Sequence, residues 1–264
     1  MKISHEVPSY LLDESVYFND YDYFLIHLIV KDQNYRNFYE KSKKLNRHII
    51  LDNSACELRG KEGFDFDEFA NWIEKLKPDE YLIPDVFNDF DKNMEYFEKW
   101  ISLYKDSPGT PIATLHGTSI EQFESAYYTF KWKCPKAKIA FNFDESVYTQ
   151  YDMCPENKSM NKMLNRISLI YNLLYRGVID TKRKHHLLGC HLPQEFKAYK
   201  GMNWIETIDT SNPVMAALEE KKYSVNGLID KPKMNIDTSQ TLEYDDVKKE
   251  CLIHNLKMFR SFCF

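Results

Sequence analysis

Short apolar runs recur along this chain, and the segments between them are each long enough for about one helix. This alternation limits the possible folds more than any other feature of the sequence. Most runs have four to eight residues and are rich in Ile, Leu, Val, Phe and Tyr, which is typical of buried strands. Seven runs are clear, at 23–30, 48–52, 80–86, 110–117, 137–143, 185–192 and 204–209, and we expect an eighth strand at 225–229.

The segments between these runs carry apolar residues at helical spacing. In 65–78 the apolar residues fall on one face, acids come first, and Pro78 ends the pattern. Further helices are predicted over 91–105, 119–133, 160–178 and 212–223, with a terminal helix over 242–264. In the helix that starts at 212, we expect Asn212 at the cap and Pro213 in the first turn.

Strands that are apolar throughout and alternate with helices indicate parallel strands, covered on both faces or closed into a barrel. Seven or eight such units in 264 residues favour an α/β fold of the (β/α)8 TIM-barrel type. The alternative is a doubly wound open sheet, but the chain has no G-x-G-x-x-G or G-x-x-x-x-G-K-[ST] phosphate loop. No linker divides the chain, so we expect one domain over residues 1–264, closed by the C-terminal helix.

Composition restricts the class of protein. The six cysteines include no C-x-x-C pair, which argues against a zinc knuckle or a disulfide scaffold. No apolar run approaches the roughly 18–20 residues of a membrane span, and the N-terminal segment carries acids where a signal peptide is apolar. We therefore expect a cytoplasmic protein with no membrane partner. The net charge of −5 argues mildly against a broad nucleic-acid surface, but a local basic patch remains compatible with it.

Polar residues stand where the predicted strands end, which is the catalytic face of a (β/α)8 barrel. Three apolar runs stop at an aspartate, namely Asp52, Asp85 and Asp209. One aspartate in this position is usually a helix cap. Three at one mouth predict a functional cluster, because an ionised aspartate is not left buried without a partner. Ser211 and Asn212 are expected to serve the following helix, which leaves the Asp209 carboxylate to point into the mouth.

Weaker signals surround these aspartates. Asn53 and Ser54 are expected to hold the turn after Asp52 through Asx-type bonds. His116 stands at a strand end, where a histidine is as often packed as functional. Candidate phosphate contacts are the lysines that follow the Asp209 strand, Lys221, Lys222, Lys231 and Lys233.

Six short motifs occur in order between residues 48 and 214: HIILDNSACEL, YLIPDV, IATLHGT, IAFNF, HLLGCHLP and IETIDTSNPV. Their order resembles that of the tRNA-guanine transglycosylase superfamily. This superfamily contains queuine and archaeosine tRNA-ribosyltransferases, and phage and bacterial enzymes that place 7-deazaguanines in DNA. The zinc site of the family, C-x-C-x-x-C, is absent. The chain therefore looks most like a compact, zinc-less enzyme that acts on DNA.

By this resemblance Asp209 matches the nucleophile and Asp52 the general acid/base. Exchange of a base breaks the C1′–N glycosidic bond through an oxocarbenium-like state. A carboxylate near C1′ stabilises that charge and traps the sugar covalently. A second acid, with a raised pKa, protonates the leaving base and deprotonates the incoming one. The resemblance implies neither a metal nor an organic cofactor.

The resemblance also implies substrate-binding residues. Asp85 matches the carboxylate that reads the amino edge of guanine. His116 and Gly117 fall where the family has a Gln-Gly pair that reads the base carbonyl. Asn142 and Gly189 fall in motifs beside the base. The histidine in place of Gln, and a cysteine where an aromatic ring would stack, leave open which base is bound.

The implied function is exchange of guanine in DNA, ahead of tRNA, for a free 7-deazaguanine that serves as co-substrate. The target nucleotide must be flipped out or single-stranded. The cytoplasm would be that of a host if the gene is carried by a phage, and a homodimer or a partner enzyme fits related barrels.

Two alternatives to a base-exchange enzyme stay open. One is a metal-dependent TIM-barrel hydrolase with ligands drawn from Asp52, Asp85, His116, His191 and Asp209. The other is a catalytically degenerate barrel subunit that binds nucleic acid or a partner protein.

Overall fold

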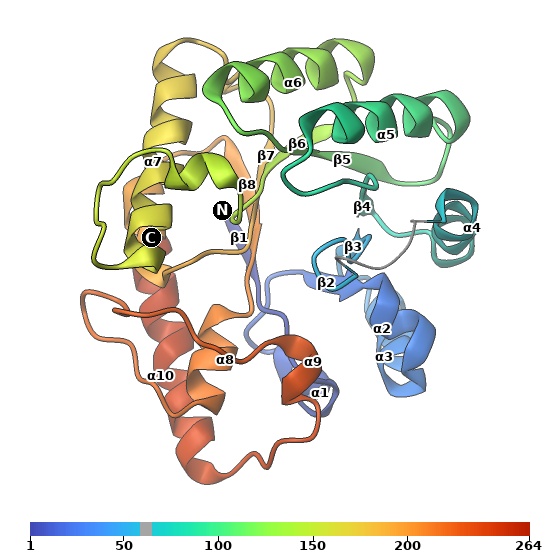
Figure 1. Cartoon of the computed structure of the whole chain (residues 1–264). Helices are drawn as coiled ribbons and strands as arrows, with labels where there is room; N and C mark the ends of the chain where they lie inside the picture. The colour runs from blue at the N-terminus through green and yellow to red at the C-terminus, as the bar shows by residue number, and fades with distance from the viewer. Residues whose placement is uncertain (59–64) are drawn as a thin grey trace.

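The computed structural model describes residues 1–58 and 65–264. Eight parallel strands form one sheet in the order β1-β8-β7-β6-β5-β4-β3-β2, curled into a nearly closed barrel with β1 and β2 at its edges (Figure 1). This is the predicted (β/α)8 architecture. The strands are β1 (Lys2–Ser4), β2 (Asp22–Leu25), β3 (Ile49–Asp52), β4 (Glu80–Leu82), β5 (Thr110–Leu115), β6 (Lys138–Phe141), β7 (His185–Leu188) and β8 (Ile205–Asp209).

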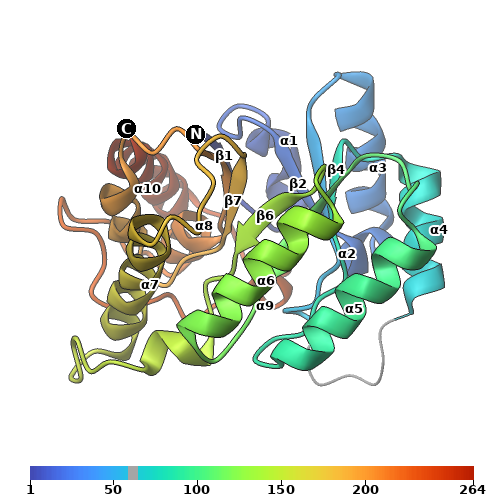
Figure 2. The same ribbon diagram turned by 90° about the horizontal axis from the view of Figure 1, so that it is seen from above.

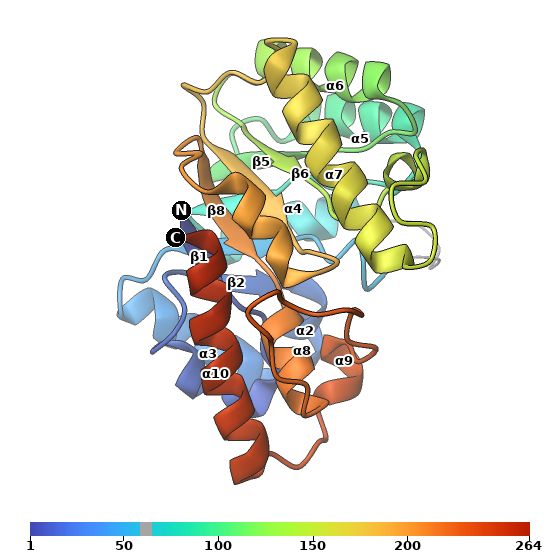
Figure 3. The same ribbon diagram turned by 90° about the vertical axis from the view of Figure 1, so that its left-hand side faces the viewer.

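Helices surround the barrel (Figures 1 and 2). They are α1 (Leu12–Ser15), α2 (Ile26–Lys31), α3 (Gln33–Lys44), α4 (Phe66–Leu76), α5 (Phe90–Leu103), α6 (Ile120–Lys133), α7 (Lys158–Tyr175), α8 (Asn212–Leu218), α9 (Ile236–Ser239) and α10 (Asp246–Cys263). Short 3-10 turns lie at Ser9–Leu11 (η1), Ser146–Thr149 (η2) and Pro193–Tyr199 (η3). The terminal helix α10 packs beside α8, and the chain ends lie near each other (Figure 3).

Helices α4, α5, α6, α7 and α10 confirm the predictions from apolar spacing to within a few residues. Helix α8 ends at Leu218, earlier than expected, and α3 was not predicted. Several start at a side-chain cap, as Ser119 does for α6, where its Oγ accepts from the amide of Gln122 at 3.3 Å. Among the described residues, no helix combines the length and the apolar character needed to cross a membrane.

Two strand predictions are wrong, and two more, 80–86 and 185–192, extend past strands that end at Leu82 and Leu188. The run at 23–30 is a strand only as far as Leu25, after which α2 begins. A continuous apolar run does not distinguish a strand from a buried helix, and α2 is largely buried. Residues 225–229 make a turn closed by a single bridge between Ser224 and Gly227. The eighth strand is β1, which at three residues is too short to show a pattern.

Side chains that precede β2 bridge the seam between β1 and β2. The Asn19 amide accepts from the backbone N of His5 at 2.7 Å and donates to its carbonyl at 3.0 Å. The backbone N of Asp20 donates to the carbonyl of Ile3 at 2.8 Å, and its carboxylate accepts from the N of Ile3 at 2.9 Å. These bonds satisfy the edge of β1 that has no neighbouring strand.

Near the N-terminal ends of the strands lies a buried ion-pair group. Lys138 Nζ is 2.6 Å from Glu80 and 2.9 Å from Glu206, and His48 Nε2 is 3.0 Å from Glu80. Burial alone would raise the pKa of Glu80, but the hydrogen bonds from His48 and Lys138 outweigh it and lower the pKa to about 2. This end of the barrel is filled by structural contacts.

Candidate active site

The C-terminal ends of the strands surround a cavity of about 320 Å³. Five of the residues expected at the site lie on its wall: Asp52, Asp85, Asn142, Gly189 and Asp209. They follow or end β3, β4, β6, β7 and β8, so the barrel alone brings them together.

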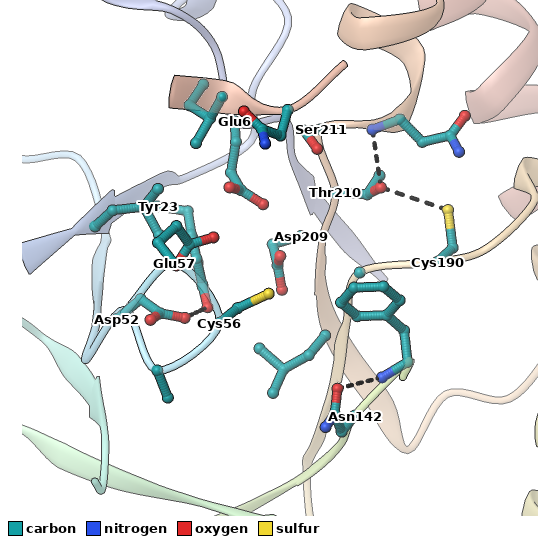
Figure 4. Close-up of a pocket in the computed structure, with 18 of the residues that line it drawn as sticks. Glu6, Tyr23, Asp52, Cys56, Glu57, Asn142, Cys190, Asp209, Thr210 and Ser211 are labelled. Carbon is teal, nitrogen blue, oxygen red and sulfur yellow. Dashed lines mark hydrogen bonds between the residues drawn. The ribbon is translucent and has the colours of Figure 1, made fainter. Parts of the chain in front are cut away.

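Six carboxylates of the described residues line this cavity: Glu6, Asp52, Glu57, Asp85, Asp209 and Asp237. Glu6, Glu57 and Asp237 were not among the predicted site residues, and Figure 4 shows Glu6 and Glu57 with Asp52 and Asp209. Glu6 follows the short strand β1, while Glu57 belongs to the turn after β3. Because β1 pairs with β8, Glu6 lies beside Asp209. Only the closure of the barrel reveals Glu6, since nothing in its local sequence marks a strand end.

Asp52 is held by two donors. The Tyr23 hydroxyl donates to one carboxylate oxygen and the amide of Ser54 to the other. Burial, followed by repulsion from Glu57, raises the pKa of Asp52 well above its ordinary value in spite of these bonds. Asp52 therefore keeps a proton at a pH where a free aspartate has lost it. The turn uses Asp52 itself as well as the predicted Asn53, whose Oδ1 accepts from Ala55 N at 2.7 Å.

Asp209 is held by a buried histidine that the sequence interpretation missed. His186 Nε2 donates to Asp209 Oδ1 at 2.8 Å, and its Nδ1 lies 2.8 Å from the hydroxyl of Thr207. The His186 ring stacks on Tyr23, with centroids 6.0 Å apart and planes 7° from parallel. The side chains that orient Asp209 and Asp52 thus pack against each other.

As predicted, the Asp209 side chain does not cap the helix that follows. The prediction that Ser211 and Asn212 cap this helix is wrong. Helix α8 starts at Asn212 without a side-chain cap from Ser211. Instead, Thr210 Oγ1 accepts from the amide of Asn212 at 3.1 Å. The Asn212 side chain turns away and accepts from the hydroxyl of Tyr223 at 2.5 Å.

The pKa values of Glu6 and Glu57 are raised as well. Burial, then repulsion from Asp209 and the other cavity carboxylates, raises the pKa of Glu6 well above its usual range, and a hydrogen bond to Asp209 adds to the shift. Burial raises the pKa of Glu57 to about 7, and nearby carboxylates add to that shift. The cavity therefore takes up protons as the pH falls toward neutrality.

His116 and Gly117 do not lie on the cavity wall, contrary to the expectation that they contact a base. The His116 side chain is 0 % exposed. Its Nε2 lies 2.7 Å from Asp85 Oδ2, and its Nδ1 is hydrogen-bonded to Glu145. Gly117 packs on α6, where a Cβ would approach Gln122 Cβ at 3.0 Å. In this chain His116 thus supports Asp85 from behind.

The loop that carries Gly189 is fixed by a buried arginine. Arg166 on α7 donates to the carbonyls of Gly189 at 2.9 Å and Phe141 at 2.8 Å, and pairs with Glu195 at 3.2 Å. Gly189 has φ +52, and a Cβ there would lie 2.6 Å from the Phe143 ring. Glycine is required at this close approach.

One of the four candidate lysines lies at the cavity. Lys231 is on its wall, with Nζ 4.5 Å from the centroid of the Phe143 ring. Cys56, also on the wall, has its pKa raised to about 12, first by desolvation within the cavity and then by the charges of Glu57 and Asp52, although its surface is partly open to solvent. It therefore remains a thiol.

Comparison of the chain with models of known protein families gives no match, and neither does comparison with curated proteins. Within the part of the chain that the structure describes, no three His, Cys, Asp or Glu side chains are grouped so that they could hold a metal ion. The expected ligands of the hydrolase alternative therefore do not form a recognisable set here.

Proposed function

We propose that this protein is a base-exchange enzyme, a transglycosylase that replaces guanine in a nucleic acid with a free 7-deazaguanine. DNA is the acceptor we favour over tRNA, because the C-x-C-x-x-C zinc motif of the tRNA enzymes does not occur in this sequence. Asp209 would be the nucleophile and Asp52 the general acid/base.

One observation carries this proposal: Asp52 and Asp209 line a single cavity in different environments. Asp52 is held protonated by burial and by Glu57, whereas Asp209 accepts a hydrogen bond from His186. A pair of carboxyl groups, one keeping its proton and one held as an acceptor, is the combination that cleavage of a glycosidic bond uses.

The reaction would run in two steps. Asp209 attacks C1′ as the C1′–N9 bond breaks, the electron pair of that bond leaves with guanine, and Asp52 gives the guanine a proton. The sugar remains bound to Asp209 as an ester. The incoming base then loses its N9 proton to Asp52 and attacks C1′, which releases the Asp209 carboxylate.

The size of the cavity fits a single flipped nucleoside. Its volume of about 320 Å³ lies at the lower end of the roughly 300–1,000 Å³ typical of ligand pockets, which suits one nucleoside and not a stacked duplex. Lys231 would contact the phosphates outside, since the acidic interior disfavours them.

The test is exchange of labelled guanine into DNA and RNA by the parent chain and by Asp209→Asn. This variant removes the nucleophile and keeps its shape, so we expect exchange to fall at least about 10³-fold and covalent trapping on nucleic acid to disappear. Asp230→Asn, an exposed change, is the matched control and should exchange at the parent rate. Exchange by Asp209→Asn at the parent rate, or none by the parent on either nucleic acid, would show the proposal to be wrong.

A further inference from the structure

Behind Asp85 lies a chain of three side chains that the reaction scheme does not use. His116 stands between the carboxylates of Asp85 and Glu145, with one ring nitrogen bonded to each. Glu145 is 0 % exposed, and Asn142 Nδ2 donates to its Oε1 at 2.7 Å. Asp85, with a side-chain exposed fraction of 6 %, and Asn142 reach the cavity wall, whereas His116 and Glu145 lie behind it.

The two flanking carboxyl groups favour a doubly protonated His116 ring. An oxygen that carries no proton only accepts hydrogen bonds, so donation from both ring nitrogens suits both contacts. Among the described residues, the ionisable groups that face His116 are Asp85, after β4, and Glu145, before η2, while Phe87 and Asn142 supply neutral contacts. Burial would lower the pKa of His116, but the hydrogen bonds and charges of the two acids outweigh it and raise the pKa to about 9.

Asp85 is held from the rear on both of its oxygens. Oδ2 takes the bond from His116, and Oδ1 accepts from Asn53 Nδ2 at 3.0 Å. Asn53 is itself fixed, because the same nitrogen donates to the carbonyl of Ile83 at 2.8 Å. Each carboxylate oxygen accepts about two hydrogen bonds, so one position on each oxygen remains for a ligand.

We propose that His116, with Glu145 as its counter-ion, is a positioning residue that holds Asp85 as a two-point acceptor for a base whose edge carries two adjacent N–H groups. This inference rests on the proposed function. His116 then lies behind the Asp85 carboxylate and, contrary to what the resemblance had implied, does not contact the base carbonyl. Selectivity then depends on the donor edge: guanine offers two donors there and hypoxanthine only one.

The first measurement needs no ligand. Nitrogen chemical shifts of the His116 ring in the full-length protein should show protonation on both nitrogens at pH 8. In Glu145→Gln the loss of one proton should move about 1–3 pH units lower, because the neighbouring negative charge is gone while the hydrogen-bond partner remains. A ring that is neutral at pH 8 in the parent would overturn the inference without touching the proposed function.

The second measurement is equilibrium dialysis with labelled guanine and hypoxanthine. In His116→Gln we expect guanine affinity to fall about 10- to 100-fold and hypoxanthine affinity to fall less, so that selectivity shrinks. In Glu145→Gln, guanine should bind as in the parent at pH 6.5 and lose affinity at a lower pH than in the parent. Guanine itself loses its N1 proton in the alkaline range, which lowers affinity in both proteins. The difference in pH between the variant and the parent therefore reports on His116.

His185→Gln is the matched control. His185 is also 0 % exposed and lies at the start of β7, where its Nε2 is 2.9 Å from the hydroxyl of Tyr127. We expect this variant to retain guanine affinity and selectivity. If His116→Gln leaves the ratio of guanine to hypoxanthine affinity unchanged, the inference is wrong. A parent chain that binds neither base would contradict the proposed function, and the inference would fall with it.

Discussion

At the scale of single residues, the neighbouring charges decide what an acid does in this barrel. Glu80 is buried beside Lys138 and His48, and its pKa drops to about 2. Asp52 is buried beside Glu57, and its pKa rises. Burial acts in the same direction on both acids, so the charge of the neighbours separates a structural ion pair from a group that can transfer a proton.

Glu6→Gln should stabilise the fold, by an amount that grows with pH. The folded chain holds a proton on Glu6 that the unfolded chain releases above its ordinary pKa of 4.5, so the stability of the parent falls as the pH rises through the raised pKa. Glutamine carries no such penalty. Urea unfolding should give a gain at pH 8 that exceeds the gain at pH 5 by about 1 kcal/mol or more.

The exposed Glu14 provides the comparison for that prediction. Glu14→Gln should change the free energy of unfolding equally at the two pH values. A gain for Glu6→Gln that is the same at pH 5 and pH 8 would contradict the raised pKa of Glu6 in the folded chain.

At the scale of elements, the loops after the strands are fixed by residues on other elements. Arg166 on α7 binds carbonyls at the ends of β6 and β7. Phe143, in the loop after β6, packs against Gly189 in the loop after β7. The wall of the cavity is therefore built by packing between loops, and a change in one loop displaces the next.

Gly189→Ala tests this coupling, with Gly177→Ala as its control. Both glycines have positive φ, +52 and +71, so both substitutions carry backbone strain of about 1 kcal/mol. Gly177 has open space around its Cβ position, whereas a Cβ at Gly189 meets the Phe143 ring at 2.6 Å. We expect Gly189→Ala to cost about 1–3 kcal/mol more in urea unfolding, and to weaken guanine binding. Equal costs for the two variants would contradict the close contact.

At the scale of the whole molecule, the seam between β1 and β2 determines whether the acidic cluster forms. β1 is joined to the sheet only through β8, and the Asn19 and Asp20 segment ties its other edge. Glu6 follows β1, while Tyr23 and Asp52 come from β2 and β3 on the far side of the seam. The cavity therefore spans the seam between β1 and β2, where the described strands form no backbone ladder.

Asn19→Ala should loosen this seam. Two backbone groups of buried His5 lose their partners, so we expect a loss of about 1–3 kcal/mol in the free energy of unfolding. Hydrogen exchange at the His5 amide should accelerate, while exchange in the β5–β6 ladder changes only as much as global stability does. The exposed Asn226→Ala should leave both unchanged. Unaltered exchange at His5 in Asn19→Ala would show that the seam is held by other contacts.

The architecture could be predicted from local pattern, because alternating apolar runs and amphipathic segments have few ways to bury their faces. It also located Asp52, Asp85 and Asp209, since an acid at the end of an apolar strand is a local signal. Such signals fail for β1, which is too short, and for 23–30, where a strand and a buried helix share one pattern.

The surroundings of those acids could not be predicted, because they depend on contacts made in the folded barrel. Glu6, His186 and Glu145 reach the site through strand pairing and side-chain packing between elements far apart in the chain. Packing between elements also places the His116 ring against Asp85 and off the cavity wall. The local sequence pattern indicates which residues are buried. The pKa shifts and side-chain directions depend on residues that become neighbours only when the barrel closes.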